Sequence, residues 1–185
     1  MILADGIIGQ MMEPVEFNRT EKKVFEEKEW WFNGCKGRAP RSAQSLLMKE
    51  GALERHNTNL QNKYKTIAEN EVRFEAYNTD DAQVIITAYG ISSRIAKSAV
   101  KLARKEGLKA GLLRPKTLWP FPSRAIASFA KPGVKFLSVD LSHGQMVEDV
   151  KLAVNGRAPV EFLGKAGGKI VTEREIASKI GEMSK

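Results

Sequence analysis

The hydrophobic positions follow different patterns in the two parts of the chain. After residue 83, short apolar runs alternate with stretches whose apolar positions recur every three or four residues. The runs predict strands at residues 84–88, 109–113, 134–140 and 160–163. The amphipathic stretches predict helices capped by Ser92 or Ser93, by Ser123 and by a Thr172–Glu175 capping box, with a further helix starting at Gln145. This alternation predicts an α/β fold: a mostly parallel sheet with helices on both faces.

The region before residue 78 has a less regular pattern. Ile2–Ala4 predicts a strand followed by a helical turn. Three adjacent aromatic side chains at residues 30–32 lie in an irregular segment and need a surface to pack on. We expect them to be exposed in this chain or to pack on another subunit. Residues 52–74 predict a long amphipathic helix, and the polar turn at residues 78–83 predicts the boundary between two structural units.

The stretch from residue 134 to residue 154 predicts a strand, a polar turn and a helix in direct succession. Ligands of such sheets bind at the carboxyl ends of the strands. Asp140, His143 and Gln145 fall at that edge, and the start of the helix adds free N–H groups. The three residues are therefore candidates for a binding edge, with an ordinary connection between strand and helix as the alternative.

A second candidate site lies in the proline-rich loop at residues 114–122. Arg114 and Lys116 follow directly after a predicted strand, where anions bind in sheets of this kind. Proline lowers the entropic cost of holding the loop in one conformation. The alternative is a rigid loop that packs Trp119 and Phe121 on a neighbour and leaves both charges solvated. If the first interpretation holds, Arg114 and Lys116 attract anions together with the turn at residues 142–145.

Composition excludes several classes of function. The net charge is +8, but the basic residues are spread along the chain and interleave with glutamates, so no basic stripe predicts nucleic-acid binding. No apolar run approaches the roughly 20 residues of a membrane span. The single cysteine, Cys35, excludes an internal disulfide and a cysteine-ligated zinc site or iron–sulfur cluster held by this chain alone, and it suits the cytoplasm.

No set of residues predicts a catalytic centre. The two histidines and one cysteine form no Ser-His-Asp, Cys-His or metal-ligand spacing. Asp5-Gly6 followed by Asn33 is similar in spacing to the signature that holds Mg²⁺ and thiamine diphosphate, and Mg²⁺ prefers carboxylate and amide oxygens. Ala4 and Gly34 depart from that signature on either side, so no metal or cofactor site is assigned here.

Four segments carry a resemblance to a known family: residues 1–17, residues 88–96, residues 113–122 and residues 139–146. They resemble the 2-oxoacid:ferredoxin oxidoreductases. The similarity is greatest to the subunit of the 2-oxoisovalerate (3-methyl-2-oxobutanoate) type that carries the pyrimidine-binding domain, and it covers only the C-terminal half of that subunit. We therefore expect this chain to lack the N-terminal part of its first domain.

The resemblance implies that the cofactors and the catalytic groups are held by different subunits. Residues 1–77 would be the end of the pyrimidine-binding domain and residues 83–185 a transketolase C-terminal-like domain. The family decarboxylates a 2-oxoacid on thiamine diphosphate, passes electrons through iron–sulfur clusters to ferredoxin and transfers the acyl group to coenzyme A. The diphosphate, Mg²⁺ and the clusters would be held by partner subunits, so we expect this chain alone to bind no cofactor and to be inactive, with self-association as a further possibility.

Another class of function stays open beside the resemblance. A free-standing transketolase-C-like module would use the edge of its sheet to hold an anionic ligand or a partner subunit. Neither interpretation involves nucleic acid or a membrane.

Overall fold

The computed structural model describes residues 1–14, 16–17 and 24–185. These residues form two compact units: Met1–Met11 with Lys65–Lys185, and Met12–Tyr64. Within the described ranges, no helix is long and apolar enough to cross a membrane.

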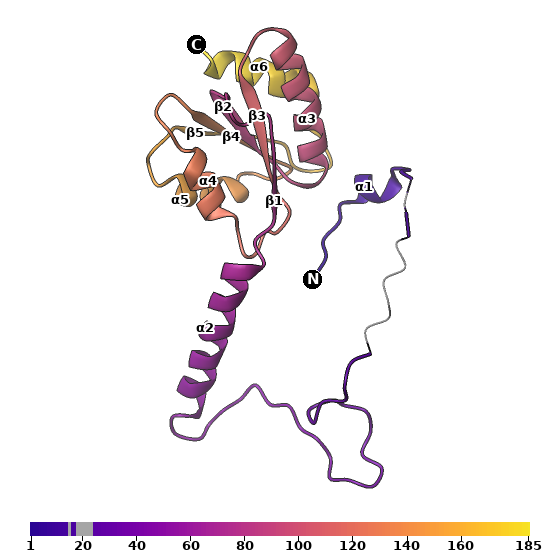
Figure 1. Ribbon diagram of the computed structural model, residues 1–185. Helices are drawn as coiled ribbons and strands as arrows, with labels where there is room; N and C mark the ends of the chain where they lie inside the picture. Colours follow the sequence, from indigo (N-terminus) through magenta and orange to yellow (C-terminus); the bar gives the residue numbers. More distant parts are fainter. Residues whose placement is uncertain (15, 18–23) are drawn as a thin grey trace. The chain divides into compact units, whose positions relative to one another are not determined.

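The larger unit is built on one five-stranded sheet with the order β1-β3-β2-β4-β5 (Figure 1). Strands β2 to β5 are parallel to one another, and β1 pairs with β3 in the antiparallel direction. This confirms the predicted α/β fold with a mostly parallel sheet. The strands are β1 (Phe74–Tyr77), β2 (Val84–Thr87), β3 (Ala110–Pro115), β4 (Lys135–Asp140) and β5 (Val160–Gly164).

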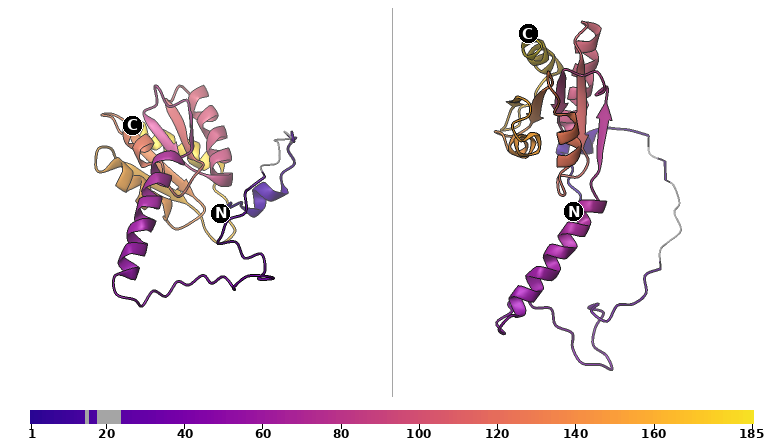
Figure 2. Two further views of the ribbon diagram at one scale, coloured as in Figure 1. Left: turned by 60° about the horizontal axis from the view of Figure 1, so that its bottom comes forward. Right: turned by 60° about the vertical axis from the view of Figure 1, so that its left-hand side comes forward.

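Helices cover both faces of this sheet, as predicted (Figure 2). Helices α3 and α6 pack on one face over a core that includes Val84, Ile86 and Leu137. Helices α4 and α5 pack on the other face over Ile85 and Phe136. Neighbouring strand residues therefore point to opposite cores, which is why these strands are apolar throughout. The helices are α3 (Gly90–Lys105), α4 (Ser123–Phe129), α5 (Met146–Val154) and α6 (Glu173–Met183).

The predicted helix caps are right in one case and wrong in two. Thr172 and Glu175 form the expected capping box, in which the Glu175 side chain accepts from the Thr172 N–H at 2.8 Å. Ser92 and Ser93 instead lie inside α3, where they are buried. Ser123 is the first helical residue of α4, and its side chain makes no capping hydrogen bond. The start of α3 has a different cap, which comes from a distant segment.

The long helix predicted at residues 52–74 is shorter, because the chain leaves the helix after Asn70 and enters an edge strand at Phe74. Helix α2 spans Ala52–Asn70, and β1 begins at Phe74. The Arg73 backbone carbonyl accepts from the Lys116 N–H at 2.9 Å, which starts the pairing of β1 with β3. The larger unit includes Lys65–Lys185, so the turn at residues 78–83 lies within it, between β1 and β2. The domain boundary expected at this turn stays a prediction.

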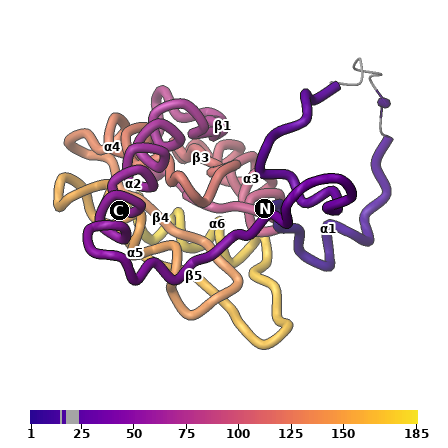
Figure 3. The backbone as a smooth tube through the Cα atoms, turned by 90° about the horizontal axis from the view of Figure 1, so that it is seen from below, coloured from indigo at the N-terminus to yellow at the C-terminus, as the bar shows by residue number. Residues whose placement is uncertain are grey.

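The strand predicted at Ile2–Ala4 is absent, while the helical turn after it is present. Ile2 and Leu3 are exposed, and helix α1 spans Gly6–Gln10. Figure 3 traces the backbone from the N-terminus through α1, which lies beside α3. Among the described residues, no strand pairs with the apolar run at the N-terminus, so periodicity alone gave the wrong element.

The smaller unit buries little of its apolar surface. Trp30 and Trp31 pack edge to face with ring centroids 6.4 Å apart. Trp30 and Phe32 are nevertheless 70% and 67% exposed, in agreement with the expected exposure, while packing on another subunit stays a prediction. The glutamate and lysines at residues 21–23, part of the interleaved charges, lie outside the described residues.

Candidate functional site

The strand order places a topological switch point between β2 and β4. From β2 the chain first crosses to β3 on one side, and then to β4 and β5 on the other side. In open α/β sheets the loops that leave the carboxyl ends of such a strand pair diverge and leave a crevice for ligands. Here those loops contain Tyr89–Gly90 after β2 and residues 141–145 after β4. We call these two loops, with Asp140, the switch-point edge.

Asp140 anchors the turn that follows β4. Its side chain is almost fully buried, with 4% exposed, and accepts from the Leu141 N–H at 2.8 Å and from the Ser142 hydroxyl at 2.7 Å. The Ser142 hydroxyl in turn accepts from the N–H groups of Gly144 and Gln145 at 3.1 and 3.2 Å. The turn is therefore held by its own side chains, and it leads directly into α5.

Tyr89 joins the two loops of the switch-point edge. Burial raises the pKa of the Tyr89 hydroxyl above its ordinary value of 10.0, and the negative charge of Asp140 and a hydrogen bond with it raise the pKa further. The hydroxyl therefore keeps its proton at neutral pH and serves as a donor to the buried carboxylate. The Asp140 carboxylate thus has three donors: the Leu141 N–H, the Ser142 hydroxyl and the Tyr89 hydroxyl. These donors stabilise the buried charge without an additional cation.

Two buried hydroxyls lie in β2 and β4, two residues before Tyr89 and Asp140 respectively. Thr87 and Ser138 are paired in register and are fully buried. Because alternate strand residues share a face, Thr87 lies on the face of Tyr89, and Ser138 lies on the face of Asp140. In the described part of the chain, neither hydroxyl oxygen has a hydrogen-bond partner. An unsatisfied buried hydroxyl costs about 1–3 kcal/mol, so this pair marks a local defect in an otherwise apolar core.

The five predicted site residues lie at one rim of the sheet but not in one cluster. His143 and Gln145 are exposed at the start of α5, next to Asp140. Arg114 belongs to β3, whose even-numbered residues Ala110 and Leu112 point to the core under α3 and α6. The basic pair and Asp140 therefore lie on opposite faces of the sheet. Joint anion binding by both groups, as proposed from the sequence, stays a prediction.

Arg114 and Lys116 gather around a carboxylate that the sequence analysis missed. Glu75 of β1 is the register partner of Arg114, and its Oε2 lies 3.7 Å from Arg114 Nη1 and 3.8 Å from Lys116 Nζ. Its Oε1 accepts from Lys97 Nζ of α3 at 3.5 Å. Glu75 was overlooked because it lay just beyond the stretch assigned to a long helix. The four residues of β1 (Phe74–Tyr77) carry no clear period of their own, so the sequence offered no signal for this strand.

Asp5 caps two helices at once. Its Oδ1 accepts from the Ile8 N–H of α1 at 2.8 Å, and its Oδ2 accepts from the Ile91 N–H of α3 at 2.9 Å. Gly90 has a φ of +55°, and a Cβ there would lie 2.8 Å from Asp5 Oδ2. Glycine is thus required by both the backbone conformation and the close approach of the carboxylate. The contact ties the N-terminal segment to the start of α3.

The spacing of Asp5 and Asn33 does not correspond to a prepared magnesium site. The Asn33 side chain donates to Glu27 and accepts from Arg38 Nη2 at 2.8 Å, while both Asp5 oxygens accept backbone N–H groups. Over the described ranges, no three His, Cys, Asp or Glu side chains are grouped so that they could hold a metal ion.

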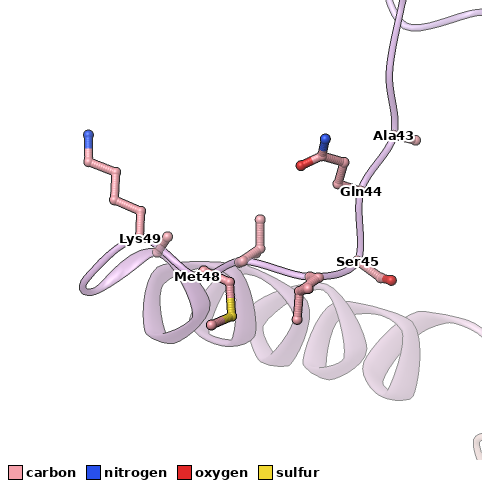
Figure 4. A pocket seen from close by; sticks show the side chains of 8 residues that line it. Ala43, Gln44, Ser45, Met48 and Lys49 are labelled. Carbon is pink, nitrogen blue, oxygen red and sulfur yellow. The ribbon is translucent and has the colours of Figure 1, made fainter.

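A hollow in the smaller unit lacks convergent polar groups (Figure 4). It has a volume of about 680 Å³ and is formed by residues 43–49 with Ala52. Figure 4 shows that the labelled side chains of Gln44, Met48 and Lys49 point in different directions. Ligand sites depend on a few polar groups directed at one point, so this hollow is not a candidate site.

Comparison with protein families identifies the α/β unit. Residues 82–176 match the family described as pyruvate:ferredoxin oxidoreductase core domain II. The chain belongs to this family. The match begins just before β2, and it covers about half of the chain, including the whole switch-point edge. The predicted resemblance to 2-oxoacid:ferredoxin oxidoreductases is thereby confirmed.

Curated relatives extend the similarity beyond this core domain II. The ketoisovalerate oxidoreductase subunit VorB of Methanothermobacter marburgensis is 44% identical over 184 residues, which is 100% of this chain and 52% of that protein. The 2-oxoglutarate synthase subunit KorA of the same organism is 43% identical over 102 residues, or 55% of this chain and 27% of that protein. The chain thus spans about half the length of the VorB relatives it matches.

Solved structures share the fold of this core domain II. A 2-oxoglutarate:ferredoxin oxidoreductase from Magnetococcus marinus, solved with 2-oxoglutarate, coenzyme A and succinyl-CoA bound, has a TM-score of 0.61 at 19% identity. That match covers 75% of this chain and 24% of the other. A split-gene transketolase, described as an inactive beta4 tetramer, has a TM-score of 0.52 at 18% identity over 60% of this chain and 41% of the other. At these identities the likeness concerns the fold alone.

Proposed function

We propose that the chain is part of a subunit of a 2-oxoacid:ferredoxin oxidoreductase that acts on a branched-chain substrate, 2-oxoisovalerate. The observation that carries this proposal is the similarity to VorB over the whole chain, at 44% identity. The KorA protein of Archaeoglobus fulgidus also aligns over 189 residues, but at only 28% identity. Membership of the core domain II family fits 2-oxoisovalerate and 2-oxoglutarate equally well. The higher identity to VorB than to this KorA, each over nearly the whole chain, supports the branched-chain assignment.

The proposed reaction is the oxidative decarboxylation of the 2-oxoacid to an acyl-CoA, with ferredoxin as electron acceptor. We propose that thiamine diphosphate, Mg²⁺, iron–sulfur clusters and coenzyme A serve the whole complex. The residues of this chain do not fit a cluster, because a cluster needs about four ligands and this chain has a single cysteine, Cys35. They also do not fit a magnesium site, since the Asp5 carboxylate caps two helices. Partner subunits would supply these groups, and cytoplasmic location follows from the same proposal.

We infer a structural role for this chain within that complex. The family match at residues 82–176 supports the assignment of residues 83–185 to a transketolase C-terminal-like domain. The assignment of residues 1–77 to the end of a pyrimidine-binding domain stays a proposal, with the reservation that β1 is hydrogen-bonded into the second domain. Asp5 would then be a link between the two domains, because it joins the N-terminal segment to the start of α3.

Co-expression with the candidate partner subunits tests the proposal. The chain should co-purify with a diphosphate-binding subunit and a cluster-bearing subunit. The complex should then reduce a viologen dye in a coenzyme A-dependent reaction, with a higher kcat/KM for 2-oxoisovalerate than for 2-oxoglutarate or pyruvate. Preference for 2-oxoglutarate would overturn the substrate assignment. A chain that never co-purifies would favour the free-standing binding module. Micromolar binding of thiamine diphosphate with Mg²⁺ to the isolated chain would overturn the proposal that partner subunits hold these cofactors.

A further inference from the structure

A basic hollow lies on the face of the sheet covered by α3, away from the buried polar groups of the switch-point edge. It has a volume of about 520 Å³ and lies between α3 and strands β1 and β3, which run side by side in Figure 1. The apolar part of its lining includes Leu112 and Ile91, which are nearly fully buried. Among its other lining residues, four are basic and two are acidic: Arg94, Lys97, Lys101, Arg114, Glu75 and Glu173. A cationic rim over an apolar floor suits a small organic anion.

The cations around Glu75 are only partly neutralised. Three of them, from Lys97, Arg114 and Lys116, share this one carboxylate at 3.5, 3.7 and 3.8 Å. Direct hydrogen bonds between a cation and a carboxylate are about 2.7–2.9 Å long, so all three contacts are loose. Within the described part of the chain, the Arg114 guanidinium has this ion pair and no hydrogen bond. Most of its five donors are therefore available to an incoming anion.

Helix α3 extends this positive surface. Lys97 and Lys101 are four residues apart and therefore share one side of the helix. Lys97 is fixed by the Tyr77 ring, whose centroid lies 4.8 Å from Nζ. Lys101 is exposed and has no ion pair with any described residue. Two helix cations and the Arg114 fork thus border the same hollow from two elements.

We propose that this hollow binds a small organic phosphate. The guanidinium fork of Arg114 matches the oxygens of a phosphate in a bidentate manner, and Lys97 and Lys101 supply further donors. The apolar floor at Leu112 contacts the body of the ligand, so an organic phosphate binds more tightly than inorganic phosphate. Glu75 keeps the cations in place when the hollow is empty and competes with the ligand for them. This site is independent of the proposed oxidoreductase function.

Titration of the full chain with phenyl phosphate, followed by amide chemical shifts, tests this site. We expect shifts at Glu75, Lys97, Lys101 and Arg114, and a weaker response to inorganic phosphate. Arg114→Gln should weaken the binding roughly ten-fold or more, because it removes charged hydrogen bonds. Glu75→Gln should strengthen the binding by roughly three-fold or more, because it removes the competing carboxylate.

Matched variants separate this site from general attraction to a basic protein. Lys151→Gln and Glu148→Gln make the same charge changes in an exposed ion pair on α5, and we expect neither to change the affinity. The proposal is overturned if Glu148→Gln strengthens the binding as much as Glu75→Gln. It is also overturned if Arg114→Gln has no effect, or if the shifted amides are spread over the whole surface.

Discussion

The two compact units of this chain differ in how their apolar side chains are used. In the larger unit, Phe136 and Ile86 are fully buried in cores on opposite faces of the sheet. In the smaller unit, the described aromatic side chains Trp30 and Phe32 are mostly exposed. The apolar side chains thus form a complete core in one unit and an uncovered surface in the other. We infer that the larger unit carries the stability of the chain. We propose that residues 12–64 depend on contacts that other parts of the proposed complex supply.

Truncation of one aromatic side chain in each unit should show the largest difference. Phe136→Ala removes a fully buried ring from the core under α4 and α5, and we expect it to lower the free energy of unfolding by about 3–5 kcal/mol. Trp30→Ala removes an exposed ring with a single edge-to-face contact, and we expect a loss below about 1 kcal/mol. Urea unfolding of the full chain measures both values. Equal losses would contradict the contrast between the units.

Asp5 tests whether the N-terminal segment belongs to the larger unit. Asp5→Ala removes the acceptor for the Ile8 and Ile91 N–H groups, and we expect a loss of about 1–2 kcal/mol in unfolding free energy. Asp80→Ala, in an exposed turn of the same unit, should have an effect below about 0.5 kcal/mol. If the two variants behave alike, the N-terminal segment does not stabilise the start of α3.

Two serines of the larger unit should respond in opposite ways. Ser142→Ala removes a hydroxyl that donates to Asp140 and accepts two backbone N–H groups, so we expect a loss of about 1–2 kcal/mol. Ser138→Ala removes a buried hydroxyl without a partner in the described residues, so stability should stay within about 0.5 kcal/mol or increase. A loss above about 1 kcal/mol for Ser138→Ala would show that the hydroxyl binds an internal water molecule.

The smallest expected effect concerns pH and the start of α6. A hydrogen bond from Lys165 and the capping contacts with Thr172 lower the pKa of Glu175 from 4.5 to about 2. Because the folded pKa is the lower one, the charged carboxylate stabilises the fold above pH 4.5, and this contribution is lost as the pH falls through the folded pKa near 2. The difference in Tm between the native chain and Glu175→Gln should therefore shrink over this interval. A difference that is constant with pH would contradict the assignment.

Local signals in the sequence predicted most of the α/β unit. The strand expected at residues 134–140 and the helix expected from Gln145 are found at Lys135–Asp140 and Met146–Val154. The capping box at Thr172 and Glu175 is also present. Each of these features is fixed by residues that are neighbours in the sequence, so hydrophobic period and cap chemistry are sufficient to recognise them.

The features that sequence analysis missed depend on distant pairs. Strand β1 forms because it pairs with β3, and its four residues follow a helix too closely to be recognised by period. The cap of α3 comes from Asp5, 86 residues away from Ile91. The partner of Arg114 is Glu75, which is visible only once β1 is placed beside β3. Candidate site residues could thus be predicted because they follow the ends of strands. The side chains that contact them could not be predicted, because they come from distant parts of the sequence.

Hydrogen exchange of the chain alone and in complex with the candidate partner subunits tests the central claim most directly. We predict that amides of the sheet and of α3 are protected in both states, because the core of the larger unit is complete. Amides around Trp30 and Phe32 should exchange rapidly in the chain alone and become protected only in the complex. Protection of these amides in the isolated chain, or rapid exchange in an active complex, would contradict the claim that this unit is completed by its partners.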